Sequence, residues 1–268
     1  MTNITEQFSS YRHLEIKTIE EITALINNED ATVAYAITKA LPQVNLLVHA
    51  IVDKLKKGGR MFYVGAGSGG RLSVLDVIEL PTTFGINKGI VNAILAGGIE
   101  HLAEAREEME DNFNEGWERL ANENASSKDI VIGISASGTT PFVLGALEAC
   151  RKNNIATGCI VSNPGSPIAS QADYPVQVIT GPEFITGSTR MKCGTAQKML
   201  FDMISTTVMV QLGRVEDNQM VNVALINNKI TDRAVKMLMG KASITDYQEA
   251  KTLLLKYGSV KNAIDCLK

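Results

Sequence analysis

The sequence predicts an α/β protein with a parallel five-stranded sheet between two layers of helices. Short apolar runs of strand length alternate with longer helical stretches, which is typical of a parallel sheet covered on both faces. The chain of 268 residues is 45% hydrophobic and 21% charged, which suits one sizeable domain with a small appendage. The five expected strands cover 60–65, 90–96, 129–135, 157–162 and 176–180.

Helices are expected before, between and after these strands. Apolar side chains recur at helical spacing in each of them, and the last one has a very apolar second half that is expected to lie against the sheet. The main expected helices cover 14–27, 31–55 with a kink at Pro42, about 99–122, and about 188–213. The tail from about Gly240 is expected to form two or three short helices. We therefore predict a main domain over 1–235 and a small helical domain over 236–268.

Composition excludes several classes of function. The net charge of −3 implies no broad basic surface, so no nucleic-acid partner is expected. The N-terminus lacks the pattern of a signal peptide and no run reaches ~18 apolar residues, so no membrane span is expected. The four cysteines form no CxxC pair, which favours reduced thiols in a cytoplasmic protein. The three scattered histidines support neither a metal site nor a Ser-His-Asp triad.

A glycine-rich loop follows the first strand, in the run 65–71 (GAGSGGR). Glycines permit positive-φ turns and let backbone N–H groups approach an anion, and the helix that follows adds its dipole. The run also satisfies GxGxxG, but a dinucleotide site needs an acid at the end of the second strand. That strand is followed by Ala96, Gly97 and Gly98, with Glu100 as the nearest acid. A tight turn without a ligand is the remaining alternative.

Hydroxyl side chains follow the third strand, directly before a helix. They can donate hydrogen bonds to a phosphate beside the N-terminal amides of that helix, although ordinary helix capping is an alternative. Because the carboxyl ends of parallel strands share one edge of the sheet, both loops are expected to hold one phosphorylated ligand. The candidate ligand residues are Gly67, Ser68, Gly69, Ser135, Ser137, Thr139 and Thr140.

Two acids lie in the mostly apolar helical run after the glycine loop. A partly buried glutamate with a raised pKa can serve as a general acid or base, which makes Glu79 a candidate. For Asp76 an ion pair with Arg71 or with a neighbouring helix is the favoured interpretation.

Further acids crowd the expected helix over 99–122. Most of them must form a solvated face, but Glu110 flanks the apolar stripe beside Met109 and can point inward. The periodicity does not choose Glu110 over Glu104 or Asp111.

Several motifs together resemble the N-acetylmuramic acid 6-phosphate etherases. These enzymes share the SIS (sugar isomerase) domain with glucokinase regulatory proteins. The resemblance covers nearly the whole chain from about Thr5, and its most specific block is 186–198 (TGSTRMKCGTAQK). The other matching runs are 65–72 (GAGSGGRL) with 75–85, 95–98 (LAGG), Glu110 with Asp111, 133–141 and 163–166 (NPGS).

The resemblance implies an SIS-type fold and a homodimer that needs no metal or organic cofactor. It implies cleavage of the D-lactyl ether of N-acetylmuramic acid 6-phosphate, which gives N-acetylglucosamine 6-phosphate and D-lactate in cell-wall amino sugar recycling. The family's two functional glutamates fall on Glu79 and Glu110. We expect Glu79 to be the proton donor and Glu110 to act as a supporting acid–base group.

The chain departs from the family pattern at Gly69, Leu80, Thr82, Thr139 and Cys193. Some of these positions fall on the ligand loops, so the exact sugar stays open. Two alternatives share the fold, namely a sugar-phosphate isomerase and a regulator that binds a sugar phosphate without turnover. The presence of both glutamates favours an enzyme.

Overall fold

The computed structural model describes residues 3–104 and 106–267, which form two compact units. The first unit comprises residues up to Leu75 together with Ile90–Ile204, and it contains the sheet. The second comprises Asp76–Gly89 and the chain from Ser205 onward. Two helices, α3 (Gly67–Phe84) and α7 (Lys192–Gln211), begin in the first unit and end in the second.

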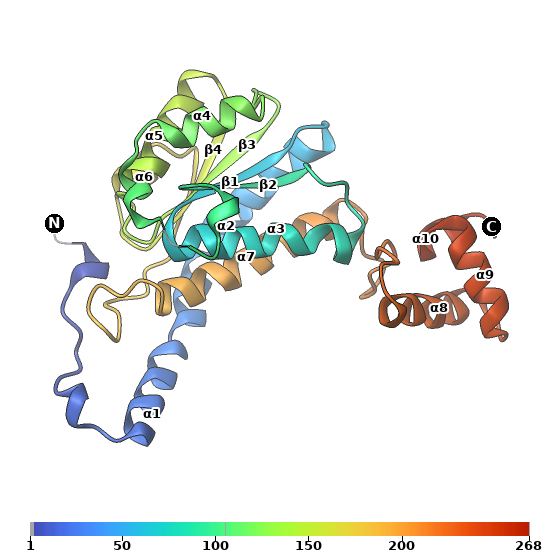
Figure 1. The fold of residues 1–268 in the computed structure, drawn as a ribbon, viewed down its shortest axis with the longest axis horizontal. Coiled ribbons are helices and arrows are strands. Elements are labelled where there is room, and N and C mark those ends of the chain that lie inside the picture. Colours follow the sequence, from blue (N-terminus) through green and yellow to red (C-terminus); the bar gives the residue numbers. More distant parts are fainter. Residues whose placement is uncertain (1–2, 105, 268) are drawn as a thin grey trace. The chain divides into compact units, whose positions relative to one another are not determined.

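The sheet has five parallel strands in the order β2-β1-β3-β4-β5, which confirms the predicted fold (Figure 1). In the register, Gly65 at the end of β1 lies level with Leu95 of β2 and Ile134 of β3. The loops after these strands therefore leave the sheet side by side. The strands are β1 (Met61–Gly65), β2 (Val91–Leu95), β3 (Ile130–Ile134), β4 (Ala156–Val161) and β5 (Tyr174–Gln177).

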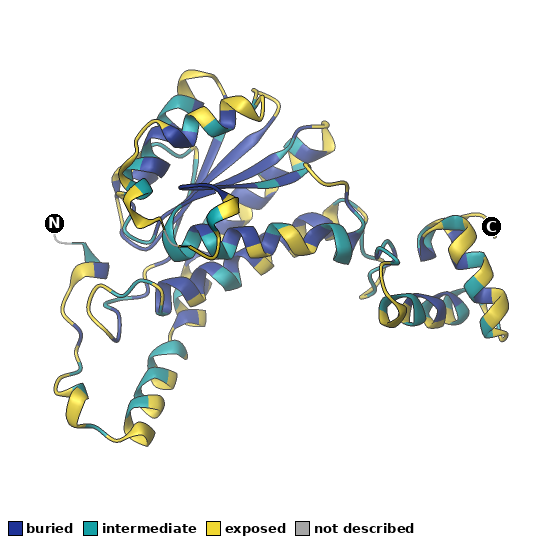
Figure 2. Cartoon of the chain, viewed as in Figure 1, coloured by how far each residue is buried: buried dark blue, intermediate teal, exposed yellow. Residues whose placement is uncertain are grey.

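Helices cover both faces of the sheet and bury its side chains (Figure 2). On one face, Phe62, Val131 and Cys159 belong to a buried cluster with side chains of α4 (Glu115–Asn122), α5 (Pro141–Lys152) and α6 (Pro167–Ser170). On the other face, the Tyr63 ring packs against Phe201 of α7, with ring centroids 5.0 Å apart. The long helix α2 (Val33–Lys56) also contacts this sheet and runs through Pro42 without ending. It follows α1 (Ile19–Asp30), which begins later than predicted.

The second unit has a core of its own. It contains α8 (Asn228–Ala242), α9 (Tyr247–Tyr257) and α10 (Val260–Asp265), which pack around buried Leu238 and Leu254. The side chains of Asn227, Asp246 and Ser259 cap the three helices by accepting from backbone N–H groups. The helical tail is therefore present, with its first helix starting earlier than predicted.

The predicted helix over 99–122 is wrong in its first two thirds. Instead, short 3₁₀ helices form at η3 (Ile99–His101) and η4 (Glu107–Asp111), and only Glu115–Asn122 is α-helical. Like charges three and four residues apart disfavour a helix here. The Asn112 side chain also accepts from the N–H groups of Asn114 and Glu115, which competes with helical hydrogen bonding. This change of structure decides how Glu110 is presented.

None of the helices in the described part of the chain is both long enough and apolar enough to cross a membrane.

Candidate functional site

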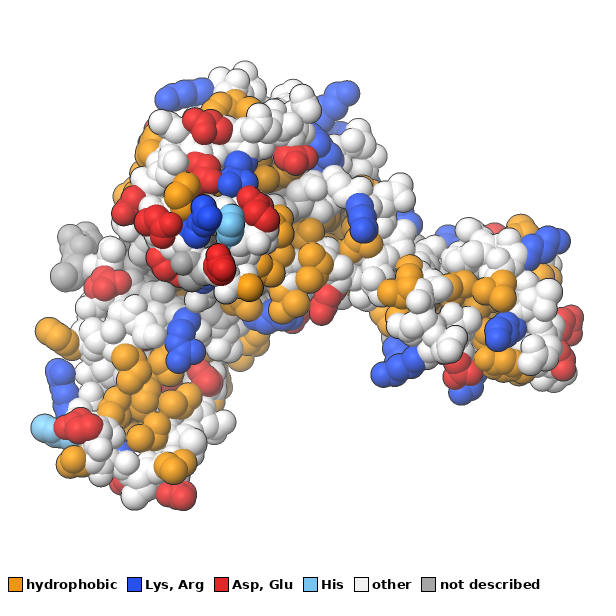
Figure 3. Space-filling model, viewed as in Figure 1, with side chains coloured by type: hydrophobic (Ala, Val, Ile, Leu, Met, Phe, Trp, Pro, Cys, Tyr) orange, Lys and Arg blue, Asp and Glu red, His pale blue; other side chains and the backbone are white. Residues whose placement is uncertain are grey.

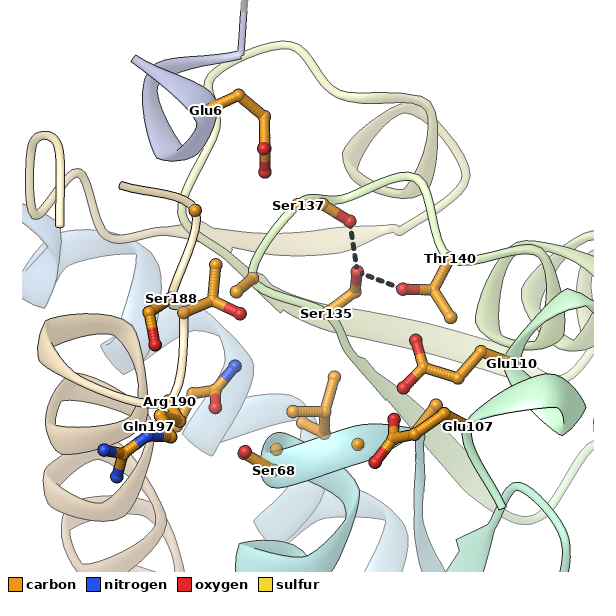
Figure 4. A pocket seen from close by; sticks show the side chains of 17 residues that line it. Glu6, Ser68, Glu107, Glu110, Ser135, Ser137, Thr140, Ser188, Arg190 and Gln197 are labelled. Carbon is orange, nitrogen blue, oxygen red and sulfur yellow. Dashed lines mark hydrogen bonds between the residues drawn. The ribbon is translucent and has the colours of Figure 1, made fainter. Parts of the chain in front are cut away.

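A polar cavity of about 320 Å³ lies at the carboxyl edge of the sheet. Its walls come from the loops after β1 and β3, from η4, from the segment before α7 and from the N-terminal arm (Figure 4). The side chains that line it include Glu6, Ser68, Glu107, Glu110, Ser135, Ser137, Thr140, Ser188, Arg190 and Gln197. All of these residues belong to the first unit.

The glycine loop forms the floor of this cavity. Gly67 has φ of +53°, a left-handed conformation that favours glycine, and it begins α3. The first N–H groups of a helix have no partner within the helix, so they can bind an anion in the cavity. Gly70 is required for another reason, because a Cβ there would lie 2.6 Å from Leu95 Cδ1. The loop therefore joins strand to helix closely and leaves its amides near the ligand space.

The hydroxyl loop forms a second wall. Ser135 Oγ lies 2.8 Å from Thr140 Oγ1 and 3.3 Å from Ser137 Oγ. Thr140 precedes α5 but makes no side-chain capping hydrogen bond, so the capping interpretation does not describe its contacts. Thr139 is exposed, does not line the cavity, and donates through Oγ1 to Ser137 Oγ at 3.0 Å. Three hydroxyls thus line one side of the cavity, where their hydrogens can turn from one another toward a bound anion.

Two carboxyl groups project into the cavity from η4. A 3₁₀ helix has three residues per turn, so Glu107 and Glu110 point in the same direction. The Glu110 carboxyl lies against the glycine loop, since a Cβ on Gly67 would be 2.7 Å from Glu110 Oε1. Arg71 donates to Glu107 Oε1 at 2.9 Å. A bulkier residue at position 67 would displace Glu110.

Burial, together with a hydrogen bond to Glu107 and its charge, raises the pKa of Glu110 to about 7. The pKa of Glu107 is lowered by its hydrogen bonds with Glu110 and Arg71. Glu110 is therefore the member that holds the shared proton, and near neutral pH it can both donate and accept one.

The other predicted catalytic acid lies elsewhere. Glu79 is exposed near the end of α3, in the second unit, and it is not among the residues that line this cavity. Asp76 is buried and accepts from Ser205 Oγ of α7 at 2.8 Å, so its contact is with a neighbouring helix. Arg71 pairs with Glu107 instead of Asp76.

Sequence reasoning missed several residues of the cavity. Ser188, Arg190 and Gln197 belong to the 186–198 block, whose distinctive sequence was the available signal. The Arg190 guanidinium points away from the carboxyl pair in Figure 4. Glu107 lies three residues before Glu110, and a spacing of three places two side chains on one face of a helix, so this spacing was the available signal.

The N-terminal arm supplies a third carboxylate, Glu6, which sequence reasoning also missed. Asn163 Nδ2 donates to Thr5 Oγ1 at 2.9 Å, and Ser9 Oγ donates to the Phe184 carbonyl at 2.7 Å. Glu6 lies between these two buried anchor residues and forms no ion pair among the residues described. Nothing local in the sequence indicates that the arm reaches the site.

Neither a metal nor a reactive thiol is indicated. The described residues contain no group of three or more His, Cys, Asp or Glu side chains arranged to hold a metal ion. Cys193 is buried, and this burial raises its pKa to about 11, so its thiolate is disfavoured.

Comparison with known proteins identifies the family. A curated N-acetylmuramic acid 6-phosphate etherase of Bacteroides fragilis is 52% identical over 265 residues, which is 99% of this chain and 94% of the relative. The relative in Porphyromonas gingivalis with the same description is also 52% identical, over 99% of this chain and 96% of its own. This chain belongs to the N-acetylmuramic acid 6-phosphate etherases. The etherase of Clostridium acetobutylicum is 46% identical over 84% of this chain and 75% of its own.

Domain models and solved structures agree on the fold of this etherase family member. The glucokinase regulatory protein N-terminal SIS domain matches residues 43–151, and the SIS domain matches residues 112–207. A phosphoheptose isomerase from Neisseria gonorrhoeae superposes with a TM-score of 0.54 at 15% identity, over 71% of this chain and 98% of its own. One from Francisella tularensis gives 0.52 at 16% identity, over 75% and 100%. At this identity the likeness shows the SIS fold alone.

Proposed function

We propose that this protein cleaves the D-lactyl ether of N-acetylmuramic acid 6-phosphate, releasing D-lactate and N-acetylglucosamine 6-phosphate in cell-wall amino sugar recycling. Membership of the etherase family supports this activity. The observation that carries it in this chain is the Glu110 carboxyl, with a pKa of about 7, held against the glycine loop. Proton transfer is the chemistry that an ether elimination needs.

The two loops suit the phosphate of such a substrate. The Ser135, Ser137 and Thr140 hydroxyls and the first amides of α3 are neutral donors that can surround the phosphate oxygens. Gly67, Ser68 and Gly69 contribute to the same cavity, whereas Thr139 is proposed to act through Ser137. With the phosphate on these donors, the sugar is proposed to lie in the same cavity, beside Glu110.

The proposed reaction starts from the ring-opened sugar. Its C1 aldehyde acidifies the C2 proton, so a carboxylate can remove it, and the C3–O bond then breaks with the electron pair leaving on lactate. An acid supplies the proton to the lactate oxygen, and water adds to the unsaturated aldehyde at C3. Each step is proton transfer plus positioning. Glu110 is proposed as an acid–base group in this sequence.

Glu79 stays a predicted proton donor on the strength of the family pattern. Its carboxylate is exposed near the end of α3 and does not line the cavity, so its role is tested by a variant of its own.

The decisive measurement is D-lactate release from N-acetylmuramic acid 6-phosphate. We expect the wild type to release lactate and Glu110→Gln to lose about 100-fold or more in kcat, since general acid–base catalysis contributes 10²–10⁴-fold. Glu79→Gln, assayed in parallel, should show a comparable loss if Glu79 donates the proton. Wild-type lactate release with full activity in both variants would contradict the catalytic assignments.

The two alternative functions, an isomerase and a binding regulator, predict different results in this assay. Conversion of a sugar phosphate without lactate would indicate an isomerase. No product, but protection against thermal unfolding by sugar phosphates, would indicate a binding regulator. In either case the family reaction would not be the activity of this chain.

We further propose that the protein is a cytoplasmic homodimer with a separate C-terminal helical domain over 236–268. Exposed apolar side chains near α1 and at the start of α2 support self-association, among them Ile16, Ile19 and Tyr35, each more than three-quarters exposed. The shared core of α8, α9 and α10 supports a separate C-terminal unit, although α8 begins at Asn228, before the predicted boundary at 236. The three buried cysteines are free, in keeping with a reducing compartment.

A further inference from the structure

We propose that Glu107 and Arg71 form a positioning pair: Glu107 holds the Glu110 carboxyl in the cavity and favours its protonated form, while Arg71 fixes Glu107. The family resemblance assigns a role to neither residue. Arg71 does not line the cavity, and its contact with the site is the one it makes with Glu107.

The carboxyl groups of Glu107 and Glu110 are close neighbours. The two residues lie one 3₁₀ turn apart on η4, and both carboxyl groups project into the cavity beside each other (Figure 4). Two carboxyl groups this close do not readily ionise together, because the second negative charge would face the first. One proton is therefore retained by the pair over a wide range of pH.

The contact with Arg71 and the difference in exposure decide which carboxyl holds that proton. The Arg71 guanidinium lies 2.9 Å from Glu107 Oε1, and this contact stabilises the charged form of Glu107. Glu107 is also the more solvated of the two, with its side chain 59% exposed, whereas Glu110 is half-buried. The negative charge is therefore more stable on Glu107, and the shared proton is more stable on Glu110.

Other charges also act on Glu110. The positive charge of Arg71 on α3 lowers the Glu110 pKa, and the charge of Asp111 on η4 raises it by less. The remaining charged residues of the cavity are Glu6 and Arg190. Glu107 is thus the neighbour whose removal should change the proton affinity of Glu110 most.

The Arg71–Glu107 contact also explains the direction of the Glu110 side chain. With Glu107 anchored to the start of α3, its carboxyl group lies next to that of Glu110, which sits beside Gly67 at the floor of the cavity. Without the anchor, Glu110 would have rotamers that point to solvent. Because this role rests on the proposed etherase reaction, its test needs one readout with substrate and one without.

The first test is the pH dependence of kcat/KM for lactate release, which reports the free enzyme. Glu107→Gln removes the negative neighbour and lowers the pKa of Glu110. Because the alkaline limb of the profile reports loss of the Glu110 proton, this limb should move down by about one pH unit or more. Above the new pKa, kcat/KM should fall about tenfold per pH unit. Activity should return as the pH is lowered. The phosphate of the substrate titrates equally in every variant, so the difference between profiles isolates the enzyme group.

Arg71→Gln should act in the opposite direction. Loss of the cation raises the proton affinity of both carboxyl groups, so the alkaline limb should move to higher pH while catalysis weakens through poorer positioning. Arg71→Lys keeps the charge and should restore the wild-type limb in part. A purely structural role for the pair would lower activity equally at all pH values.

Glu108→Gln is the matched control. Glu108 lies between the two on η4, is exposed and does not line the cavity, so its profile should match the wild type. Each variant is first checked for wild-type circular dichroism and thermal unfolding. Identical alkaline limbs for Glu107→Gln and Glu108→Gln would overturn the proposal.

The second test needs no substrate. Carboxyl ¹³C resonances of labelled glutamates are followed against pH, with Glu110 assigned by its disappearance in Glu110→Gln. The Glu110 signal should titrate near neutral pH in the wild type and at lower pH in Glu107→Gln. An ordinary glutamate pKa for Glu110 in the wild type would overturn the proposal, even if lactate is released. Absence of lactate with the expected titration would instead reject the proposed function and leave the proton-holding pair standing.

Discussion

At the scale of single residues, the site combines a backbone conformation that only glycine adopts readily with a carboxyl group packed against that backbone. The glycine loop accepts a positive φ so that a carboxyl group can lie against its backbone. Gly67 and Glu110 therefore have to be considered together. Gly69, which departs from the family pattern, is also closely packed. A Cβ at this position would lie 2.9 Å from Gln197 Oε1. A residue with a side chain at position 69 would require Gln197 to move.

Gly67→Ala is expected to abolish most activity at a modest cost in stability. The new methyl group would meet Glu110 Oε1 at 2.7 Å, and the positive φ should cost about 1 kcal/mol or more in unfolding free energy. Gly58→Ala is the control, because Gly58 has φ of +81° and no atom near the added Cβ. Denaturant unfolding should show similar losses for both variants, whereas only Gly67→Ala should lose lactate release. Equal activity of the two would argue against the contact.

At the scale of elements, the N-terminal arm is held across the carboxyl edge of the sheet by side-chain hydrogen bonds. Asn163 Nδ2 donates both to Thr5 Oγ1 and to the Ser137 carbonyl, each at 2.9 Å. One amide thus joins the arm to the hydroxyl loop. Through this link the position of Glu6 depends on a residue far away in the sequence.

Asn163→Ala should loosen the arm and weaken substrate binding. Its removal leaves the buried Thr5 N–H and hydroxyl without these partners, at a cost of about 1–3 kcal/mol in unfolding free energy. KM should rise several-fold with a smaller change in kcat, and amide exchange at Thr5 should become faster. Thr23→Ala, which removes an exposed hydroxyl on α1, should change neither. Unchanged KM with faster exchange at Thr5 would show that the arm does not serve the site.

At the scale of the whole molecule, the apolar side chains outside the core are informative. Figure 3 shows hydrophobic side chains gathered over the N-terminal helical segment, at the lower left. The helix α1 has no buried residue, although Ile22 and Leu25 lie on it. A helix with no fully buried residue in its own chain gains little stability from packing unless another surface covers it.

Ile19→Lys combined with Tyr35→Lys is therefore expected to convert a dimer to a monomer. Burying a lysine charge in an apolar interface is unfavourable, so the mass from light scattering during size-exclusion chromatography should halve. Glu15→Lys changes an exposed residue beside α1 and should leave the mass unchanged. A monomeric wild type would contradict the proposed homodimer, and a dimeric double variant would place its interface elsewhere.

The sequence by itself determined the sheet, the two loops at its carboxyl edge and the family. Strands β1 to β4 follow from short apolar runs between helical stretches, whereas β5 begins and ends earlier than the run predicted over 176–180. The loops follow from glycines and hydroxyls at strand ends. These features are local, because period, turn chemistry and capping depend on neighbouring residues. The family block 186–198 is equally a matter of contiguous sequence. For the same reason the sequence offered Glu110 as a candidate without explaining what lies beside it.

Only the tertiary structure decided the surroundings of Glu110 and the reach of the arm. The segment 99–114 looks helical by periodicity, yet the structure breaks it into short 3₁₀ helices, and η4 presents Glu107 and Glu110 to the cavity. The partner of Arg71 is Glu107, not the nearby Asp76, and Thr5 meets Asn163 from 158 residues away. Such contacts depend on how distant segments pack at one sheet edge, and no short-range pattern encodes them.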